Sequence, residues 1–338
     1  MKQFIWCLLL VPFFCTAQSQ NLIVLNGNTK TSLRGLSIVT DQVFWVSGSN
    51  GAVGKTVDAG KTWNWFKPKG YEKLDFRDIE AFDEKQAIIV NAGSPAYILK
   101  TIDGGQTWTE QYKNTDTAIF LDGLGFYDKN NGIIFGDPIK DKMQLLKTSN
   151  AGATWEDISG NLKISLAKGE AGFAASGTTV KTLKGGKVWI STGGYVSNIY
   201  YSPDYGRNWK IYKCPIVQGE TTTGPFSMDF YKEKTGIVVG GNYVKDKDNS
   251  NNILLTSDGG QTWRKPVTPV FGYRSGVTYV NRNTLVATGT SGTDISFDGG
   301  LNWKHIADQS FNAVQKIRGK NAVILAGEKG NIYYLSLQ

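Results

Sequence analysis

The chain has 338 residues and a formal net charge of +8, and 40% of its residues are hydrophobic, enough for a large buried core. Its lysines are scattered rather than clustered, which argues against a nucleic-acid partner. Two of the three Cys lie within the first 17 residues, which have the pattern of a signal peptide, so the mature chain would keep one Cys and no multi-cysteine metal site. No glycine-rich nucleotide motif precedes a helix. We therefore expect neither a metal nor a cofactor.

The first 17 residues have the three parts of a signal peptide. Lys2 is the basic start, residues 4–14 are apolar, and residues 15–17 form a small-residue cleavage site. The bulky residues before Cys15 do not fit a lipobox. We expect a mature chain of residues 18–338 that is periplasmic or secreted, monomeric and without a membrane span.

A short apolar strand is expected at 21–25, and an eight-residue phrase then recurs six times. The phrase reads Ser/Thr-x-Asp-x-Gly-x-Thr/Asn-Trp, with Asn replacing Asp once. Its copies lie at 56–63, 101–108, 148–155, 202–209, 256–263 and 296–303. Successive copies are 40 to 54 residues apart, which is about the length of one four-stranded propeller blade.

The third residue of each phrase is expected to hold a turn together. An Asp or Asn side chain accepts hydrogen bonds from backbone N–H groups of its own turn, and the following Gly permits a conformation that a side chain obstructs. The Trp then starts the next strand and buries an apolar face. Since no second acid lies beside them, we interpret six residues as structural turns rather than calcium ligands: Asp58, Asp103, Asn150, Asp204, Asp258 and Asp298.

Each unit is expected to contain four strands. In the second unit the apolar and β-branched segments are 77–82, 86–92, 97–101 and 108–112, with turn residues between them. The last unit has only three such segments, 313–317, 322–326 and 331–335, and pairing with 21–25 would complete it. The sequence therefore predicts an all-β, seven-bladed propeller as a single domain, with six or eight blades as alternatives.

Charged residues recur at the starts of the expected innermost strands, on the face opposite the Asp turns: Arg34, Arg77, Asp122, Glu170 and Arg274. These strands converge on one channel, so the charges should gather there. Arginine suits carboxylate or phosphate recognition, and Tyr243 and Tyr273 on the same face offer stacking surface. An ion-pair network that only plugs the pore would explain the same charges.

A catalytic role is the alternative interpretation. Asp122, Asp137 and Glu170 are candidate acids of a carbohydrate-active hydrolase, provided that two of them flank a cleft at a suitable separation. For each acid taken singly, the favoured explanation is a salt-bridged or solvated carboxylate. His305, the only His, follows a fourth-strand Trp and is a poor candidate for a triad base or metal ligand. Whether the chain is an enzyme stays open.

The six phrases resemble the Asp-box, or BNR, repeats of sialidases and related propellers. The inner-strand starts at 33–36 and 76–79 look like the photosystem II assembly-factor type of propeller. Residues 169–176, 272–277 and 289–292 resemble a bacterial envelope group whose members carry the labels oxidoreductase or glycosyl hydrolase. The sialidase Arg-Ile-Pro signature is absent, because Gly35 and Asp78 follow the two arginines.

The assembly-factor resemblance implies a binding scaffold whose Arg-lined face holds a partner protein. The matching positions in this chain are Arg34, Arg77 and Arg274. We expect an exported propeller that binds a partner protein or a glycan at the mouth of its channel. The three arginines would hold anionic groups, while Tyr243 and Tyr273 would stack on the ligand.

Overall fold

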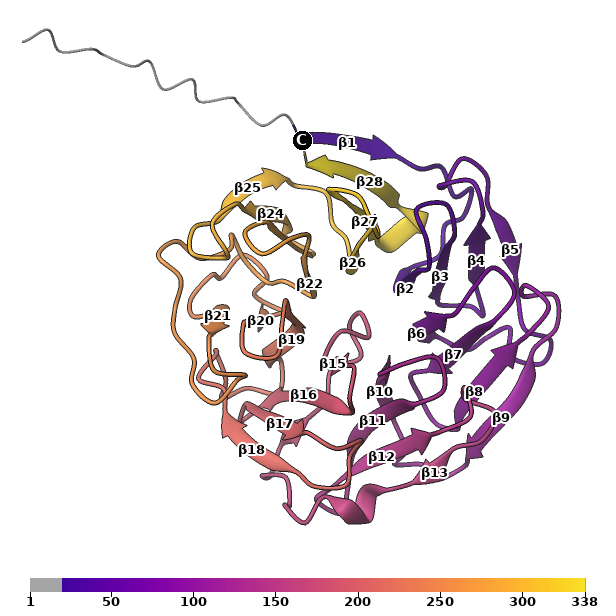
Figure 1. Ribbon diagram of the computed structural model, residues 1–338, viewed down its shortest axis with the longest axis horizontal. Coiled ribbons are helices and arrows are strands. Elements are labelled where there is room, and N and C mark those ends of the chain that lie inside the picture. The colour runs from indigo at the N-terminus through magenta and orange to yellow at the C-terminus, as the bar shows by residue number, and fades with distance from the viewer. Residues whose placement is uncertain (1–19, 338) are drawn as a thin grey trace, which may run out of the picture.

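The computed structural model describes residues 20–337, and the predicted signal peptide at 1–17 lies outside the described residues. Seven antiparallel sheets form a ring around a central channel (Figure 1). The prediction of an all-β, seven-bladed propeller is therefore confirmed. Within residues 20–337 there is no helix long and apolar enough to span a bilayer.

Blades 1 to 3 each contain four strands, which follow one another from the channel outwards. Blade 1 comprises β2 (Leu33–Ile38), β3 (Phe44–Gly48), β4 (Val53–Thr56) and β5 (Asn64–Phe66). Blade 2 comprises β6 (Phe76–Ala81), β7 (Ala87–Asn91), β8 (Ala96–Thr101) and β9 (Thr109–Asn114). Blade 3 comprises β10 (Leu121–Phe126), β11 (Gly132–Ile139), β12 (Lys142–Thr148) and β13 (Glu156–Asp157), and the short 3-10 helix η1 (Ser159–Asn161) follows it.

Blade 4 departs from this pattern, because its innermost strand is divided. It comprises β14 (Glu170–Ala171) and β15 (Val180–Leu183), which both pair with β16 (Lys187–Gly194), then β17 (Asn198–Ser202) and β18 (Lys210–Lys213). Blade 5 comprises β19 (Thr223–Phe230), β20 (Gly236–Asn242) and β21 (Ile253–Thr256), and a single bridge between Leu255 and Arg264 stands in for its fourth strand.

Blade 6 comprises β22 (Gly276–Tyr279), β23 (Leu285–Gly289), β24 (Gly292–Ser296) and β25 (Lys304–Ala307). Blade 7 comprises β26 (Ala313–Lys316), β27 (Ala322–Ala326) and β28 (Ile332–Leu337), with the 3-10 helix η2 (Glu328–Gly330) before β28. Its fourth strand is β1 (Gln20–Val24), which pairs antiparallel with β28 and places Leu22 opposite Leu335. The two ends of the chain thus close the ring as predicted, and the strands lie side by side in Figure 1.

The hydrophobic core lies between neighbouring blades. Ile88 and Val90 of blade 2 pack with Leu124 and Ile134 of blade 3 in one such cluster, and all four side chains are buried. Burying an aliphatic side chain of this size contributes roughly 1.5–3 kcal/mol. Polar side chains add contacts nearer the channel, where Leu124 N donates to Asp78 Oδ2 at 2.6 Å across the same two blades.

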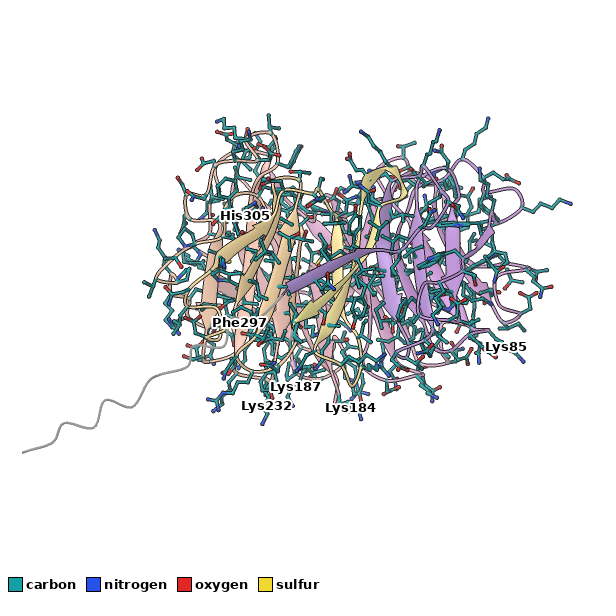
Figure 2. All side chains as sticks on the ribbon, turned by 90° about the horizontal axis from the view of Figure 1, so that it is seen from above. Lys85, Lys184, Lys187, Lys232, Phe297 and His305 are labelled. Atoms are coloured by element: carbon teal, nitrogen blue, oxygen red, sulfur yellow. The ribbon has the colours of Figure 1, made fainter. Side chains whose placement is uncertain are left out.

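The Asp turns connect the third and fourth strands of their blades. In the first, the Thr56 hydroxyl donates to Asp58 Oδ1 at 2.7 Å, and Thr62 N donates to the same oxygen at 2.9 Å. Bonds from Thr62 lower the pKa of Asp58 to about 2. Strands one and three end on the same face, and Gly104 N of the second Asp turn donates to Lys85 O. Figure 2 shows Lys85, Lys184 and Lys232 along this face.

Candidate functional site

An extra residue interrupts the innermost strand at the same place in four blades. In blade 1 the pairing with β3 shifts between Leu33 and Gly35, so that Arg34 has no partner in the ladder. A bulge of this kind re-aims the side chain of its extra residue. The corresponding extra residues of blades 2, 3 and 5 are Arg77, Asp122 and Phe226.

These bulge residues line one cavity of about 470 Å³ at the channel mouth, on the face away from the Asp turns. A further bulge, in the pairing of β11 with β12, adds Asp137 to the same cavity. Glycines of the second strands, opposite these bulges, permit this geometry. A Cβ at Gly48 would collide with the Ser32 carbonyl, and one at Gly136 would collide with the Phe120 carbonyl.

The floor of the cavity is a segment that crosses the channel, residues 172–179 between β14 and β15, which we call the channel segment. Arg34 Nη1 donates to Ala175 O at 3.2 Å, and Arg77 Nη1 donates to Ala174 O at 3.4 Å. On the far side, the Ser176 hydroxyl donates to the carbonyl of Ser275 in blade 6. The loop reaches towards the centre of the ring beside β15 in Figure 1.

The channel segment also divides the channel into two cavities. Its Ala174 and Ala175 line the cavity at the mouth, while Ser176 and Thr178 line a second cavity of about 460 Å³ on the Asp-turn side. A plug is therefore present in the pore, although it is not the ion-pair network that the sequence interpretation described. It is made by the main chain of blade 4 rather than by pairing between charged side chains.

The two cavity arginines lie close together and retain free donors. Burial lowers the pKa of Arg34, and the positive charge of Arg77 lowers it further. Arg77 Nε donates to Asp75 Oδ2 at 2.7 Å, whereas Arg34 has no acid within 4.0 Å among residues 20–337. Each guanidinium has five N–H donors, so N–H groups of both stay available for an anion after these contacts.

Two acids lie on the same cavity and contact each other. Asp122 is 2% exposed, and neither of its carboxyl oxygens has a donor among the described residues. Its carboxyl lies within hydrogen-bonding reach of Asp137, whose Oδ1 accepts Gly172 N at 2.9 Å. Burial raises the pKa of Asp122 well above its usual range, and the charge of Asp137 raises it further, while the charge of Arg77 and the Ala174 N–H oppose the rise. Burial raises the pKa of Asp137 as well, so the pair can hold one proton between its carboxyls.

An aromatic wall lies beside these charges. Phe173 stacks on Phe226 with ring centroids 4.0 Å apart, and Tyr273 meets the edge of Phe226 at 4.8 Å. Tyr243 is 48% exposed and contacts Phe226 at 5.9 Å. The cavity therefore combines a positive edge, an acidic edge and an apolar surface.

Two residues expected at the site do not reach the cavity. Arg274 is fully buried and forms an ion pair with Asp294 at 2.6 Å, because it lies just before β22 at the position that the buried Leu33 occupies in blade 1, one residue before that of Arg34. Glu170 is also buried, where Asn198 Nδ2 and the Tyr200 hydroxyl each donate to it at 3.0 Å. Both residues lie near inner-strand starts, as the sequence predicted, but their polar groups bind to other side chains in the interior and not to the cavity.

The sequence analysis missed the phenylalanines of the cavity. Phe226 lies between Pro225 and Ser227, at the position of blade 5 that corresponds to Arg34 in blade 1, so aligning the units would have found it. Phe173 gave no such signal, because it lies on the channel segment, outside the repeat pattern. His305 lies on the outermost strand β25, where its Nδ1 contacts Asp294 at 3.0 Å.

Fold and site define a seven-bladed β-propeller with a charged cavity at one mouth of its channel. No family model matches the chain. The chain is similar to the photosystem II assembly lipoprotein Ycf48 of Synechococcus sp. strain CC9902, at 23% identity over 330 residues, covering 94% of this chain and 89% of that protein.

Solved structures show the same fold. YCF48 bound to a D1 peptide superposes with a TM-score of 0.67 at 15% identity, covering 98% of this chain and all of that one. YCF48 from Cyanidioschyzon merolae gives a TM-score of 0.66 at 14% identity, covering 93% and 98%. The WD40 propeller of Doa1 reaches 0.64 at 10% identity, covering 95% and 98%. At these identities the likeness defines the architecture rather than the ligand.

Proposed function

We propose that this protein is exported and binds an extended segment of a partner protein in the mouth cavity, where Arg34 and Arg77 hold a carboxylate of that segment. The observation that carries the proposal is a pair of neighbouring guanidiniums, with free N–H groups, on one cavity. Like charges held together in this way favour an anionic ligand. The aromatic wall around Phe226 would cover the apolar part of the segment.

The comparisons support a peptide-sized ligand. The structurally similar YCF48 has been solved with a D1 peptide bound, and the curated relative is named for an assembly role. The proposal that this chain is exported rests on the predicted signal peptide at 1–17. The proposal that its ligand is anionic rests on the two arginines of the cavity, Arg34 and Arg77.

A glycan is the second candidate, because the exposed ring of Tyr243 at the cavity rim could stack on a sugar. Glycoside hydrolysis has less support. The carboxyls of Asp122 and Asp137 lie within hydrogen-bonding reach, closer than the roughly 5 Å or more that glycosidases keep between their acids. Binding without turnover is therefore the function that this geometry favours.

The test uses the protein lacking residues 1–17 and a random hexapeptide library. Peptides retained by the immobilised protein are sequenced, resynthesised and titrated by fluorescence anisotropy. Arg34→Ala and Arg77→Ala should each weaken binding by about tenfold or more, because each removes a charge-assisted hydrogen bond. Replacing the peptide's carboxylate by an amide should have a similar effect.

Arg207→Ala is the matched control, since Arg207 is exposed in the Asp turn of blade 4, on the opposite face. It removes the same charge and should leave binding unchanged. If no peptide is retained, or if the two cavity variants bind like the wild type, the proposal is wrong. Neutral and acidic oligosaccharides tested in parallel would then show whether the glycan candidate replaces it.

A further inference from the structure

We propose that Asp122 and Asp137 form a second recognition element in the mouth cavity, which binds a cationic group of the ligand: a lysine ammonium or an arginine guanidinium. This inference rests on the proposed function, because the same ligand would have its carboxylate on Arg34 and Arg77. The ligand class is therefore a peptide segment that carries a basic side chain close to a carboxylate.

The first argument is the unpaired acid. Asp122 is 2% exposed, and both of its oxygens lack a donor among residues 20–337. A buried polar group without a partner costs about 1–3 kcal/mol, and more when it is charged. The nearest groups are the carboxyl of Asp137 and the main-chain N–H of Ala174, which forms no well-aligned hydrogen bond, and two acids satisfy one another only by keeping a proton. A ligand cation would supply the missing counter-charge.

The second argument is the position of the pair. The extra residue of the β10 bulge is Asp122, and that of the β11 bulge is Asp137, so both face the channel from one blade. Asp137 is the more exposed of the two, and both line the cavity. A cation in the cavity can therefore contact Asp137 with Asp122 close by.

The third argument is that neither arginine forms an ion pair with these acids, although the charge of Arg77 opposes the rise in the pKa of Asp122. Arg77 makes its ion pair with Asp75 at 2.7 Å, and Arg34 donates to a main-chain carbonyl. Charges of both signs thus line one cavity of about 470 Å³ without pairing with each other. A purely anionic ligand would meet the acids unfavourably, while a ligand with both charges complements the two edges.

The size of the cavity limits how far apart those charges can be. A volume of about 470 Å³ lies at the lower end of the range for small-ligand sites, so it holds one or two side chains. The basic residue and the carboxylate must therefore be neighbours or nearly so in the bound segment. A retained peptide pool should consequently show Lys or Arg within about two positions of the carboxylate that the Arg pair needs.

The experiment uses the same hexapeptide library with the wild type, Asp137→Asn and Asp122→Asn. The wild type should enrich Lys and Arg beside the required carboxylate, and replacing that basic residue by norleucine should weaken binding about tenfold. Both Asn variants should lose this preference and bind the lysine and norleucine peptides equally. Glu156→Gln, on the exposed outermost strand of the same blade, removes the same charge and should retain the preference.

The outcomes separate this inference from the proposed function. Retention that depends on the arginines but shows no basic preference would overturn the acid-pair role alone. A preference that survives in Asp137→Asn, with thermal unfolding showing a folded variant, would overturn it too. Absence of retention, or retention independent of Arg34 and Arg77, would overturn both. Because Asp137 is the more exposed acid, its variant keeps the test decisive if Asp122→Asn does not fold.

Discussion

The bulge residues determine which side chains enter the channel. In blade 6, Arg274 lies one residue before the position that corresponds to Arg34, and it stays buried in an internal ion pair. Where a bulge occurs, Arg34 and Asp122 face the cavity. Just below the mouth, other acids serve the fold, and Asp78 accepts N–H groups from Ile79 and from Leu124 of the next blade.

The buried carboxyl of Asp78 should make stability depend on pH. Burial raises its pKa to about 8, against an ordinary value of 3.8. The unfolded chain therefore loses this proton first, so the contribution of Asp78 to stability is fully present below about pH 4 and is lost as pH rises to about 8. On the order of several kcal/mol is at stake over this range.

Urea unfolding at pH 5 and pH 8 checks this expectation. The wild type should lose more unfolding free energy between the two pH values than Asp78→Asn, which has no proton to release. Glu80, whose pKa burial raises to about 7, contributes in the same direction and is present in both proteins. Glu156→Gln should behave like the wild type. Equal losses in the wild type and Asp78→Asn would contradict the assignment.

At the scale of elements, the channel segment is the departure from the repeat that matters most. It divides the innermost strand of blade 4, and two of its carbonyl groups accept hydrogen bonds from Arg34 and Arg77. Its other end packs against blade 2, where the Asp78 carboxyl lies so close to Gly177 that there is no room for a Cβ. The segment thus joins the floor of the binding cavity to the inner wall of the ring.

Gly177→Ala should destabilise the protein through this contact. Gly177 has φ +72, and a Cβ there would collide with the carboxyl of Asp78. The control is Gly185→Ala, since Gly185 has φ +84 but open space around a Cβ. Backbone strain alone should cost the control about 1–2 kcal/mol, and overpacking should cost Gly177→Ala about 1–3 kcal/mol more. Urea unfolding midpoints measure the stability loss of both variants. Equal midpoints would mean that the channel segment shifts to accommodate the extra methyl group without cost, which would contradict this prediction.

The repeat made the blades predictable, and it located part of the site. The spacing of the Asp turns gave six units, the terminal segments gave the seventh, and the inner-strand starts gave Arg34, Arg77 and Asp122. Arg274 and Glu170 were misplaced because both occupy the position of Leu33, one residue before that of Arg34, and a shift of one residue reverses the direction of a strand side chain. The channel segment was beyond reach for a different reason: its contacts join blade 4 to blades 1, 2 and 6, and no local pattern encodes them.

For the whole molecule, closure of the ring depends on one short strand at the beginning of the described chain. β1 supplies the outer strand of blade 7, and its pairing covers an edge of β28 that would otherwise be open. Leu22 contacts the buried cluster of blades 6 and 7, whereas Ile23 points outwards and is 46% exposed. Side chains alternate along a strand, so the same substitution can be made at the packed Leu22 and at the exposed Ile23. Comparing the two separates the loss of ring closure from the effect of adding a charge to β1.

Leu22→Asp should therefore open the ring, while Ile23→Asp should not. A charge at Leu22 would face Leu335 across the pair and the apolar cluster behind it, and we expect a loss of about 2–3 kcal/mol of unfolding free energy. The exposed substitution should change stability by less than about 0.5 kcal/mol. Urea unfolding gives both values, and light scattering should reveal self-association of the Leu22 variant through the uncovered β28 edge. If the two variants were equally stable, packing of β1 on β28 would not stabilise the closed ring. The stability of the propeller would then have to come from the contacts between blades.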